Sequence, residues 1–289
     1  MRSTPVCLAI AVTMAACTTG DAITSPGPRA LPEMVAVRPV PDHVVDTDVA
    51  CGDLITTDVR LEADLTCTGD ALSVTADGIT INLNGHTITG AGVLVTGVGI
   101  TVRNRSDITI HGGTIASFQS GIFVSQSTGV VIKDNGFTQN REAVFLIGSS
   151  GNVVKSNVAW QNTSRGIMLR PTGGGIVSTN NDVVDNVLTN NPSGILVFGQ
   201  SGNTLKGNTI SGSTVGAFDL TGGGGTGNVI KENTLTASLA GIKFGPGWAS
   251  GNDIIGNTIT SNTCGTAGNG ASNTFKDNVF TSNTTDICP

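Results

Sequence analysis

Asparagine recurs along this chain at a nearly fixed interval, each time within a similar short phrase such as Asp185-Asn186-Val187 or Asp277-Asn278-Val279. The series consists of Asn135, Asn157, Asn186, Asn208, Asn233, Asn257 and Asn278, with steps of 22, 29, 22, 25, 24 and 21 residues. His86 and Gly113 hold the equivalent place in two earlier phrases, and the nine positions from 86 to 278 have a mean step of 24. We name these nine positions the anchors. A repeat of this length predicts one structural unit stacked many times.

Two columns of apolar residues flank the anchors and predict the strands of each repeat. Three residues before the anchors stand Leu83, Ile110, Ile132, Val154, Val183, Leu205, Ile230, Ile254 and Phe275. Two residues after them stand Ile88, Ile115, Phe137, Ala159, Leu188, Ile210, Leu235, Ile259 and Phe280. The residues between the columns follow a period of two, as the side chains of strands do. We therefore expect both columns to face a core.

A third strand is expected eight or nine residues after each anchor, where a glycine usually stands. Segments of this kind are 121–124, 143–146, 166–169, 194–197 and 241–244. Three short strands in about 24 residues close one coil, and successive coils then pair in parallel at a rise of about 4.8 Å. The predicted fold is all-β, a solenoid of about nine to ten three-stranded coils.

Asparagine also fills two further columns at other points of the repeat. Five residues before the anchors stand Asn152, Asn181, Asn203, Asn228, Asn252 and Asn273. Five residues after them stand Asn140, Asn162, Asn191, Asn262 and Asn283, with Ser213 and Ser238 in two repeats. Asn tolerates the backbone conformations of bends, and its amide can bond to the same amide one coil away. The three columns therefore predict structural corners of the coil and no catalytic role.

The N-terminal part of the chain indicates export. Residues 1–16 combine Arg2 with a short apolar run, which is typical of a signal peptide and too short to span a bilayer. The run ends in Met14-Ala15-Ala16-Cys17, which resembles the bacterial lipobox and implies lipidation of Cys17. Residues 17–46 are rich in Pro, Thr, Ala and Gly and predict a flexible tether. We expect a lipid-anchored protein of the bacterial cell envelope, on the periplasmic or the outer surface.

Four cysteines remain beyond this segment: Cys51, Cys67, Cys264 and Cys288. An even count in an exported chain suggests disulfides, and four cysteines allow three pairings. Cys51 and Cys67 lie close together, and Cys264 and Cys288 are one repeat of 24 residues apart. We therefore favour one disulfide at each end of the stack, 51–67 and 264–288. No metal site is expected, because neither Cys-x-x-Cys nor a nearby His accompanies these cysteines.

The charge of the chain argues against nucleic acid as a partner. Its formal net charge is −6, its isoelectric point is about 4.9, and Lys and Arg form no dense cluster. Binding to nucleic acid depends on such clusters, because phosphate contacts provide much of the affinity.

The repeat region from Cys51 to Cys288 resembles the right-handed parallel β-helix superfamily of pectate lyases, alginate epimerases and NosD-type periplasmic proteins. Its closest local match is ITINLNGHTI at residues 79–88, which is similar to the first coil of NosD-type and carbohydrate-binding members. The segment from Cys51 to Asp70 is similar to their N-terminal cap. The resemblance implies a pectin lyase-like fold, a right-handed parallel β-helix with an N-terminal cap over residues 47–289. It selects no single activity, because the superfamily includes lyases, hydrolases, epimerases and adhesins.

The third strand carries an apolar column on its expected outward side, formed by Phe123, Phe145, Met168, Leu196 and Phe218. Exposed apolar stripes mark contact surfaces, so this column is a candidate for covering by the tether, by a second subunit or by sugar rings. Charged and aromatic side chains near the same strand complete a candidate saccharide site, namely Arg141, Glu142, Arg165, Arg170, Asp219, Lys243 and Trp248.

We expect this protein to bind polysaccharide, or another extended component of the cell envelope, along a lateral face. The alternative is a polysaccharide lyase or uronate epimerase on the same fold, and a further alternative is a structural surface protein. The Asp-Pro-His-Asp motif of alginate epimerases of this fold is absent. No cofactor is expected for the binding protein, and Ca²⁺ belongs only to the lyase alternative, whose relatives gather carboxylates around that ion. The sequence assigns no catalytic residue.

Overall fold

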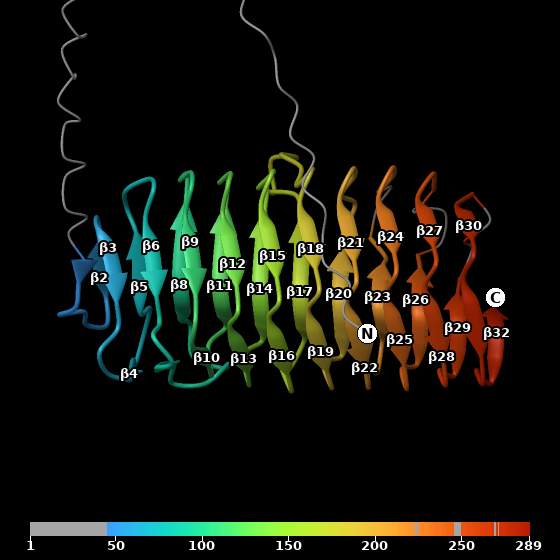
Figure 1. Ribbon diagram of the computed structural model, residues 1–289, viewed down its shortest axis with the longest axis horizontal. Helices are drawn as coiled ribbons and strands as arrows, with labels where there is room; N and C mark the ends of the chain where they lie inside the picture. Colours follow the sequence, from blue (N-terminus) through green and yellow to red (C-terminus); the bar gives the residue numbers. More distant parts are fainter. Residues whose placement is uncertain (1–44, 223–224, 246–249, 269, 271) are drawn as a thin grey trace, which may run out of the picture. The chain divides into compact units, whose positions relative to one another are not determined.

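The computed structural model describes residues 45–222, 225–245, 250–268, 270 and 272–289. Over these residues the chain winds through three parallel sheets, and in Figure 1 the coils follow one another from β2 at the blue end to β32 at the red end. We name the three sheets A, B and C. The described residues include no helix that is long and apolar enough to cross a membrane.

Each sheet takes one strand from each coil, so its neighbours in space are about one repeat apart in sequence. Sheet A contains β1 (Val45–Asp46), β3 (Asp58–Arg60), β6 (Thr80–Asn82), β9 (Thr109–His111), β12 (Val131–Lys133), β15 (Val153–Lys155), β18 (Asp182–Val184), β21 (Thr204–Lys206), β24 (Val229–Lys231), β27 (Asp253–Ile255) and β30 (Thr274–Lys276). Sheet C contains β4 (Leu65–Thr66), β7 (Thr87–Thr89), β10 (Thr114–Ala116), β13 (Gly136–Thr138), β16 (Val158–Trp160), β19 (Val187–Thr189), β22 (Thr209–Ser211), β25 (Thr234–Thr236), β28 (Thr258–Thr260) and β31 (Val279–Thr281). Sheet B contains β2 (Asp53–Ile55), β5 (Leu72–Val74), β8 (Val98–Arg103), β11 (Ser120–Ser125), β14 (Glu142–Ile147), β17 (Arg165–Arg170), β20 (Ser193–Val197), β23 (Gly216–Leu220), β26 (Ala240–Phe244), β29 (Cys264–Ala267) and β32 (Thr285–Cys288).

The three-sheet stack confirms the predicted solenoid and its number of coils. Strands pair in parallel and in register, so that Ile132 of β12 lies beside Val154 of β15 and Val154 lies beside Val183 of β18. β1 already pairs with β3, so the first strand of the stack begins two residues before the expected start of the domain at residue 47. The expected signal peptide and nearly all of the expected tether lie outside the described residues.

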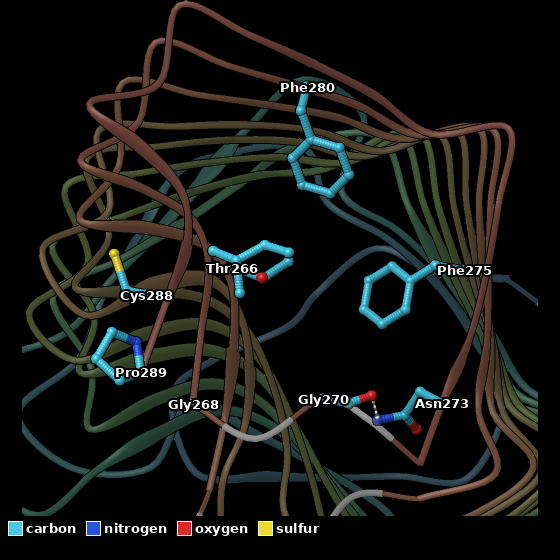
Figure 2. Close-up of a pocket in the computed structure, with 9 residues that line it drawn as sticks. Thr266, Gly268, Gly270, Asn273, Phe275, Phe280, Cys288 and Pro289 are labelled. Carbon is cyan, nitrogen blue, oxygen red and sulfur yellow. Dashed lines mark hydrogen bonds between the residues drawn. The ribbon is translucent and has the colours of Figure 1, made fainter.

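The two apolar columns beside the anchors form the core, as expected. Nearly all of their members are fully buried, for example Leu205 and Ile210. Phe275, with 41% of its surface exposed, and Phe280, which is partly buried, are the exceptions, because their coil has no further coil stacked over it. Figure 2 shows Phe275 and Phe280 directed into the interior of the last coil, where they border an apolar hollow of about 740 Å³.

The three asparagine columns form hydrogen-bonded ladders at the corners of the coil. Asn157 shows the pattern: its backbone N–H and its side-chain Nδ2 both donate to Oδ1 of Asn186, at 3.0 Å each. Its Nδ2 also donates to the carbonyl oxygen of Ile132 in the preceding coil, at 3.0 Å. Before the last coil the ladder asparagines are buried, and their amides satisfy backbone groups that would otherwise be left unpaired inside the protein.

The backbone turns at the residue before nearly every ladder asparagine, and this corrects the expected role of the asparagine. Asp134, Asp185 and Glu232 precede anchors and have φ angles of 56°, 54° and 57°, in the left-handed region. Gly207 and Gly256 occupy the same place in two other coils. The bend is therefore made by the preceding residue, and the asparagine contributes the amide that ties one coil to the next.

Both disulfides join the cysteines that the spacing predicted. Cys51 is bonded to Cys67, and Cys264 is bonded to Cys288. The second bond holds β32 against β29, where Cys288 lies beside Ala267. Each disulfide therefore closes one end of the described stack.

Replacing one ladder asparagine in the middle of the stack should destabilise the protein strongly. Asn186→Ala removes the acceptor used by Asn157 and the donor used by the Val154 carbonyl, which leaves buried polar groups unpaired. We expect a loss of about 3 kcal/mol or more in the free energy of unfolding, measured by urea denaturation. Lys155→Ala, on an exposed side chain, should change that value by no more than about 0.5 kcal/mol. Equal effects of the two substitutions would contradict the ladder's role.

Removing the second disulfide should loosen the last coil first. The double substitution Cys264→Ala and Cys288→Ala releases β32, which pairs with a strand on one side. We expect a loss of about 3 kcal/mol in the free energy of unfolding, because the disulfide restricts the unfolded chain. Amide hydrogen exchange should accelerate in β30 to β32 before it does in β12 to β21. Uniform acceleration over all coils would argue against a local effect.

Candidate functional site

Strict register on sheet B aligns its outward side chains into three parallel columns. The first contains Ser120, Glu142, Arg165 and Ser193. The second contains Phe123, Phe145, Met168, Leu196, Asp219 and Lys243. The third contains Arg103, Ser125, Ile147 and Arg170. Residues about one repeat apart in sequence are thus brought side by side on one face.

A small side chain in each coil keeps these strands close together. A Cβ atom on Gly121 would lie 2.6 Å from the carbonyl oxygen of Ala143 and 2.9 Å from the ring of Phe137. Ala143 itself shows that a methyl group can be accommodated at the equivalent point of the next coil, where it is fully buried. The preference for Gly at the start of the third strand therefore reflects close packing inside the coil.

The three columns enclose a groove of about 400 Å³ on the outer face of β8, β11, β14, β17 and β20. Phe123, Phe145, Met168 and Leu196 form its apolar floor. The rings of Phe123 and Phe145 meet edge to face, with centroids 5.3 Å apart. Met168 and Leu196 are 5% and 3% exposed, so the predicted stripe is the floor of a groove and only its phenylalanine end is open.

Arginine side chains line both walls of the groove. The guanidinium carbon of Arg103 lies 4.5 Å from the centroid of the Phe123 ring, and that of Arg170 lies 5.8 Å from the centroid of the Phe198 ring. Both distances are within the range of a cation–π interaction, which holds each guanidinium over an aromatic face. Arg141 and Arg165 line the other wall.

Glu142 is the one carboxylate among the residues lining the groove, and it is 4% exposed. Its Oε1 accepts a hydrogen bond from Nη1 of Arg165 at 3.2 Å and lies 3.6 Å from Nε of Arg141. Burial raises the pKa of this carboxyl, although the positive charges of Arg141 and Arg165 oppose the increase. The cost of removing the carboxylate from water therefore exceeds the attraction of its two partners.

The arrangement suits an anionic ligand that has an apolar face. Four guanidinium groups and one carboxylate leave three positive charges when Glu142 is ionised, in a chain whose net charge is −6. Arg remains protonated at any physiological pH, so these groups bind and orient charge and do not act as bases. No group of three or more His, Cys, Asp or Glu in the described ranges is placed to hold a metal ion.

The structure brings together four of the seven predicted ligand-binding residues: Arg141, Glu142, Arg165 and Arg170. Asp219 and Lys243 lie beside each other in the second column, on the coils beyond the groove. Asp219 is buried and accepts hydrogen bonds from Ser193 Oγ at 3.0 Å and Thr221 Oγ1 at 2.6 Å, which gives it a structural role. Trp248 lies outside the described residues.

Phe218 was wrongly predicted to point outward. It lies beside Ile195 and Ile242 in an inward column and is fully buried, and Asp219 takes the outward place beside Leu196. The expectation aligned Gly216 with the glycines that open the neighbouring strands. Ala217 holds that position here, so the true register is one residue later, which exchanges the two faces of the strand.

Five residues that line the groove were not predicted as parts of it: Val98, Arg103, Gln119, Ser120 and Phe198. Arg103 ends the third strand of an early coil, which the spacing rule missed because the phrase Gly99-Ile100 begins 13 residues after the anchor His86 and not eight or nine. Extending the third-strand register back to residues 98–103 would have placed Arg103 in the same column as Arg170.

Comparison with known proteins supports the architecture over most of the chain. A family model described as "Right handed beta helix region" matches residues 71–235. Among curated proteins no sequence match is found.

Solved structures similar to this chain include several proteins that act on or bind polysaccharides. An alginate lyase from Paenibacillus sp. str. FPU-7 is 15% identical, with a TM-score of 0.59 over 79% of this chain and 92% of the lyase. A periplasmic alginate epimerase is 15% identical, with a TM-score of 0.52 over 78% of this chain and 73% of the epimerase. A tailspike protein of the E. coli bacteriophage HK620, solved in complex with a pentasaccharide, is 10% identical, with a TM-score of 0.63 over 84% of this chain and 56% of the tailspike. At these identities the similarity concerns the fold.

The buried carboxylate should make stability depend on pH in a defined direction. Because the pKa of Glu142 is raised above its ordinary value of 4.5, its contribution to stability is fully present below that value and is lost as the pH rises through the folded-state pKa. The stability of the wild type relative to Glu142→Gln should therefore fall between acidic and neutral pH. Urea denaturation of both proteins across that range measures the difference.

A second variant tests the cause of this pH dependence. Arg165→Gln removes a positive charge that opposes the shift, so the pKa of Glu142 should rise further, and the loss of stability should become larger and extend to a higher pH. A constant difference in stability between wild type and Glu142→Gln at all pH values would show that the carboxyl is not perturbed by burial.

Proposed function

Because the chain belongs to the right-handed β-helix family, whose fold presents long lateral faces to extended ligands, we propose that it binds an anionic polysaccharide in the groove of sheet B. The ligand class that fits best is a uronic-acid polymer such as alginate. The observation that carries the proposal is the alignment of four guanidinium groups along an apolar floor that includes two phenylalanine rings.

The two halves of the groove match the two chemical features of a uronate chain. Each sugar ring has an apolar face of C–H groups that can pack on Phe123 and Phe145, and each carboxylate can accept paired N–H donors from Arg. Arg103 and Arg170 are held in place by their contacts with Phe123 and Phe198, so they lose little freedom when a ligand binds. The groove runs across five neighbouring strands, so it is long enough for a chain of several sugar units.

A binding role is favoured over hydrolysis because the groove supplies one carboxyl group. Glycoside hydrolases of the common type place two carboxyl groups about 5–10 Å apart around the bond that is cleaved. Among the residues that line the groove Glu142 alone has a carboxyl group, and ion pairs with Arg141 and Arg165 surround it. The lyase or epimerase alternative retains one supporting feature, since Glu142 is a buried acid with a raised pKa of the kind used in proton transfer.

We also propose that the protein is exported and attached to the cell envelope through a lipid on Cys17. Two disulfides support a location outside the cytoplasm, where such bonds persist. The apolar run before Cys17 and the composition of residues 17–44 support the anchor and the tether. The polysaccharide would then be a component of the envelope or of its surroundings.

Binding of alginate oligosaccharides should depend on the arginines of both walls. Arg103→Ala, Arg165→Ala and Arg170→Ala should each weaken binding about tenfold or more, since a charge-assisted hydrogen bond contributes about 1.5–3 kcal/mol. Affinity measured by isothermal titration calorimetry should also fall with rising salt concentration. Lys155→Ala on sheet A provides the matched control, because it removes one positive charge away from the groove.

Incubation of the protein with alginate also distinguishes a binding protein from an enzyme. A binding protein leaves the ultraviolet absorbance of unsaturated uronates and the uronate composition measured by NMR unchanged after long incubation. A rise in that absorbance would identify a lyase, and a changed composition would identify an epimerase. Affinity for alginate that all three arginine substitutions leave unaltered would refute the proposed site.

A further inference from the structure

The outer face of sheet C is free of charge along its whole length. Nine of its ten strands, all except β4, are three residues long, and in these nine the first and third residues point outward while the middle one points to the core. The first-residue column reads Thr87, Thr114, Gly136, Val158, Val187, Thr209, Thr234, Thr258 and Val279. The third-residue column reads Thr89, Ala116, Thr138, Trp160, Thr189, Ser211, Thr236, Thr260 and Thr281. We name these 18 positions the threonine face.

Threonine accounts for much of this face, at five positions in the first column and six in the third. Each threonine presents a hydroxyl and a methyl group on a side chain with restricted rotation. Parallel pairing fixes their spacing at about 4.8 Å between strands and about 6.6 Å along each strand. The result is a regular array of polar and apolar groups, of which Val187 and Val279 are 40% and 51% exposed.

A tryptophan lies across the middle of this array, and a glycine makes room for it. Trp160 is in the third column of β16, and its six-membered ring extends diagonally over Gly136 of the neighbouring β13. A Cβ atom on Gly136 would lie 3.3 Å from Cζ3 and Cη2 of that ring. The indole is therefore held down against the sheet, where one side of it packs on the backbone and part of it stays exposed.

We propose that the threonine face binds a neutral polysaccharide, with a sugar ring stacked on Trp160 and neighbouring hydroxyl groups bonded to threonine. We choose a neutral polymer as the partner because of the charge of this face. None of the 18 positions has a charged side chain, so the face offers no counter-ion to an anionic polymer, nucleic acid or an acidic lipid surface.

The composition of the face also distinguishes a glycan from a second copy of the chain. Protein interfaces concentrate aromatic residues, Met and Arg at their centre, whereas this face has one aromatic residue among its 18 positions. Threonine hydroxyls both donate and accept hydrogen bonds, as sugar hydroxyls do, and Thr281 Oγ1 already donates to Thr260 Oγ1 at 3.0 Å. A planar aromatic ring beside such hydroxyls provides the stacking surface that a sugar ring needs.

The threonine face and the groove of sheet B are separate sites, since they belong to different sheets of the coil. Their ligands differ in charge, one neutral and one anionic. The protein could in this way hold two polymers at once along the same stack of coils. The proposal for the threonine face does not depend on alginate binding in the groove.

The test is co-sedimentation of the full chain with two insoluble neutral polysaccharides, microcrystalline cellulose and chitin. We expect the wild type to sediment with at least one of them and the binding to persist at high salt concentration. Trp160→Ala should weaken binding about tenfold or more, since loss of an aromatic contact and its buried area costs more than about 1.4 kcal/mol. Trp160→Phe should retain part of the affinity.

Gly136→Val is the second variant, and it leaves Trp160 in place. Valine fills the same column at Val158 and Val187, so the strand accepts it, but its side chain would displace the indole from the sheet. We expect weaker binding to the particles with an unfolding midpoint close to that of the wild type. Arg165→Ala is the matched control: it should lose affinity for alginate oligosaccharides and keep the wild-type affinity for the particles.

Three results would overturn the proposal. The first is failure of the wild type to bind either polysaccharide, and the second is unchanged binding by both Trp160→Ala and Gly136→Val. The third is a concentration-dependent dimer, seen by sedimentation velocity, that Trp160→Ala abolishes, because this would assign the threonine face to a second copy of the chain.

Discussion

Hydrogen bonds from one coil to the next determine almost everything else about this molecule. A backbone that turns three times in about 24 residues has three corners, and each corner buries N–H and C=O groups that no neighbouring strand satisfies. The ladder amides satisfy them by bonding to the same position one coil away. This arrangement has a single register, because a shift of one residue would break every ladder at once.

Fixed register turns a sequence column into a surface. Glu142 and Arg165 are 23 residues apart in the chain, yet they lie on adjacent strands and form an ion pair. The same rule aligns the arginines and phenylalanines of the groove on sheet B and the threonines on sheet C. Neither face needs long-range folding information beyond the repeat itself, which is why two chemically different faces can coexist on one scaffold.

Much of the fold could be predicted from the sequence, because the constraints are local and repeat many times. Ile81 and Ile110 alternate with polar neighbours in the way that a half-buried strand requires, and the spacing of Cys264 and Cys288 equals one coil. The groove was harder to predict, because it depends on exact register where the pattern is irregular. Ala217 stands where the neighbouring strands have glycine, so the predicted register was one residue off. Phe218, which was expected on the surface, is in the core. Arg103 belongs to a coil whose third strand starts farther from the anchor than the others do, since Gly99 is 13 residues after His86.

The longest coil shows where variation in this architecture is absorbed. Its extra residues form a compact turn between β17 and β18, closed by bonds of Thr172 with Ile176 and of Ser178 Oγ with the Arg170 carbonyl. Asn152 and Asn181 still meet across this insertion, with Nδ2 to Oδ1 at 2.9 Å. Length can thus change at this corner, next to Arg170 on the wall of the groove, without disturbing the stack. Evolution can therefore modify the wall of the groove by inserting or deleting loop residues there, while the scaffold that confers stability is inherited unchanged.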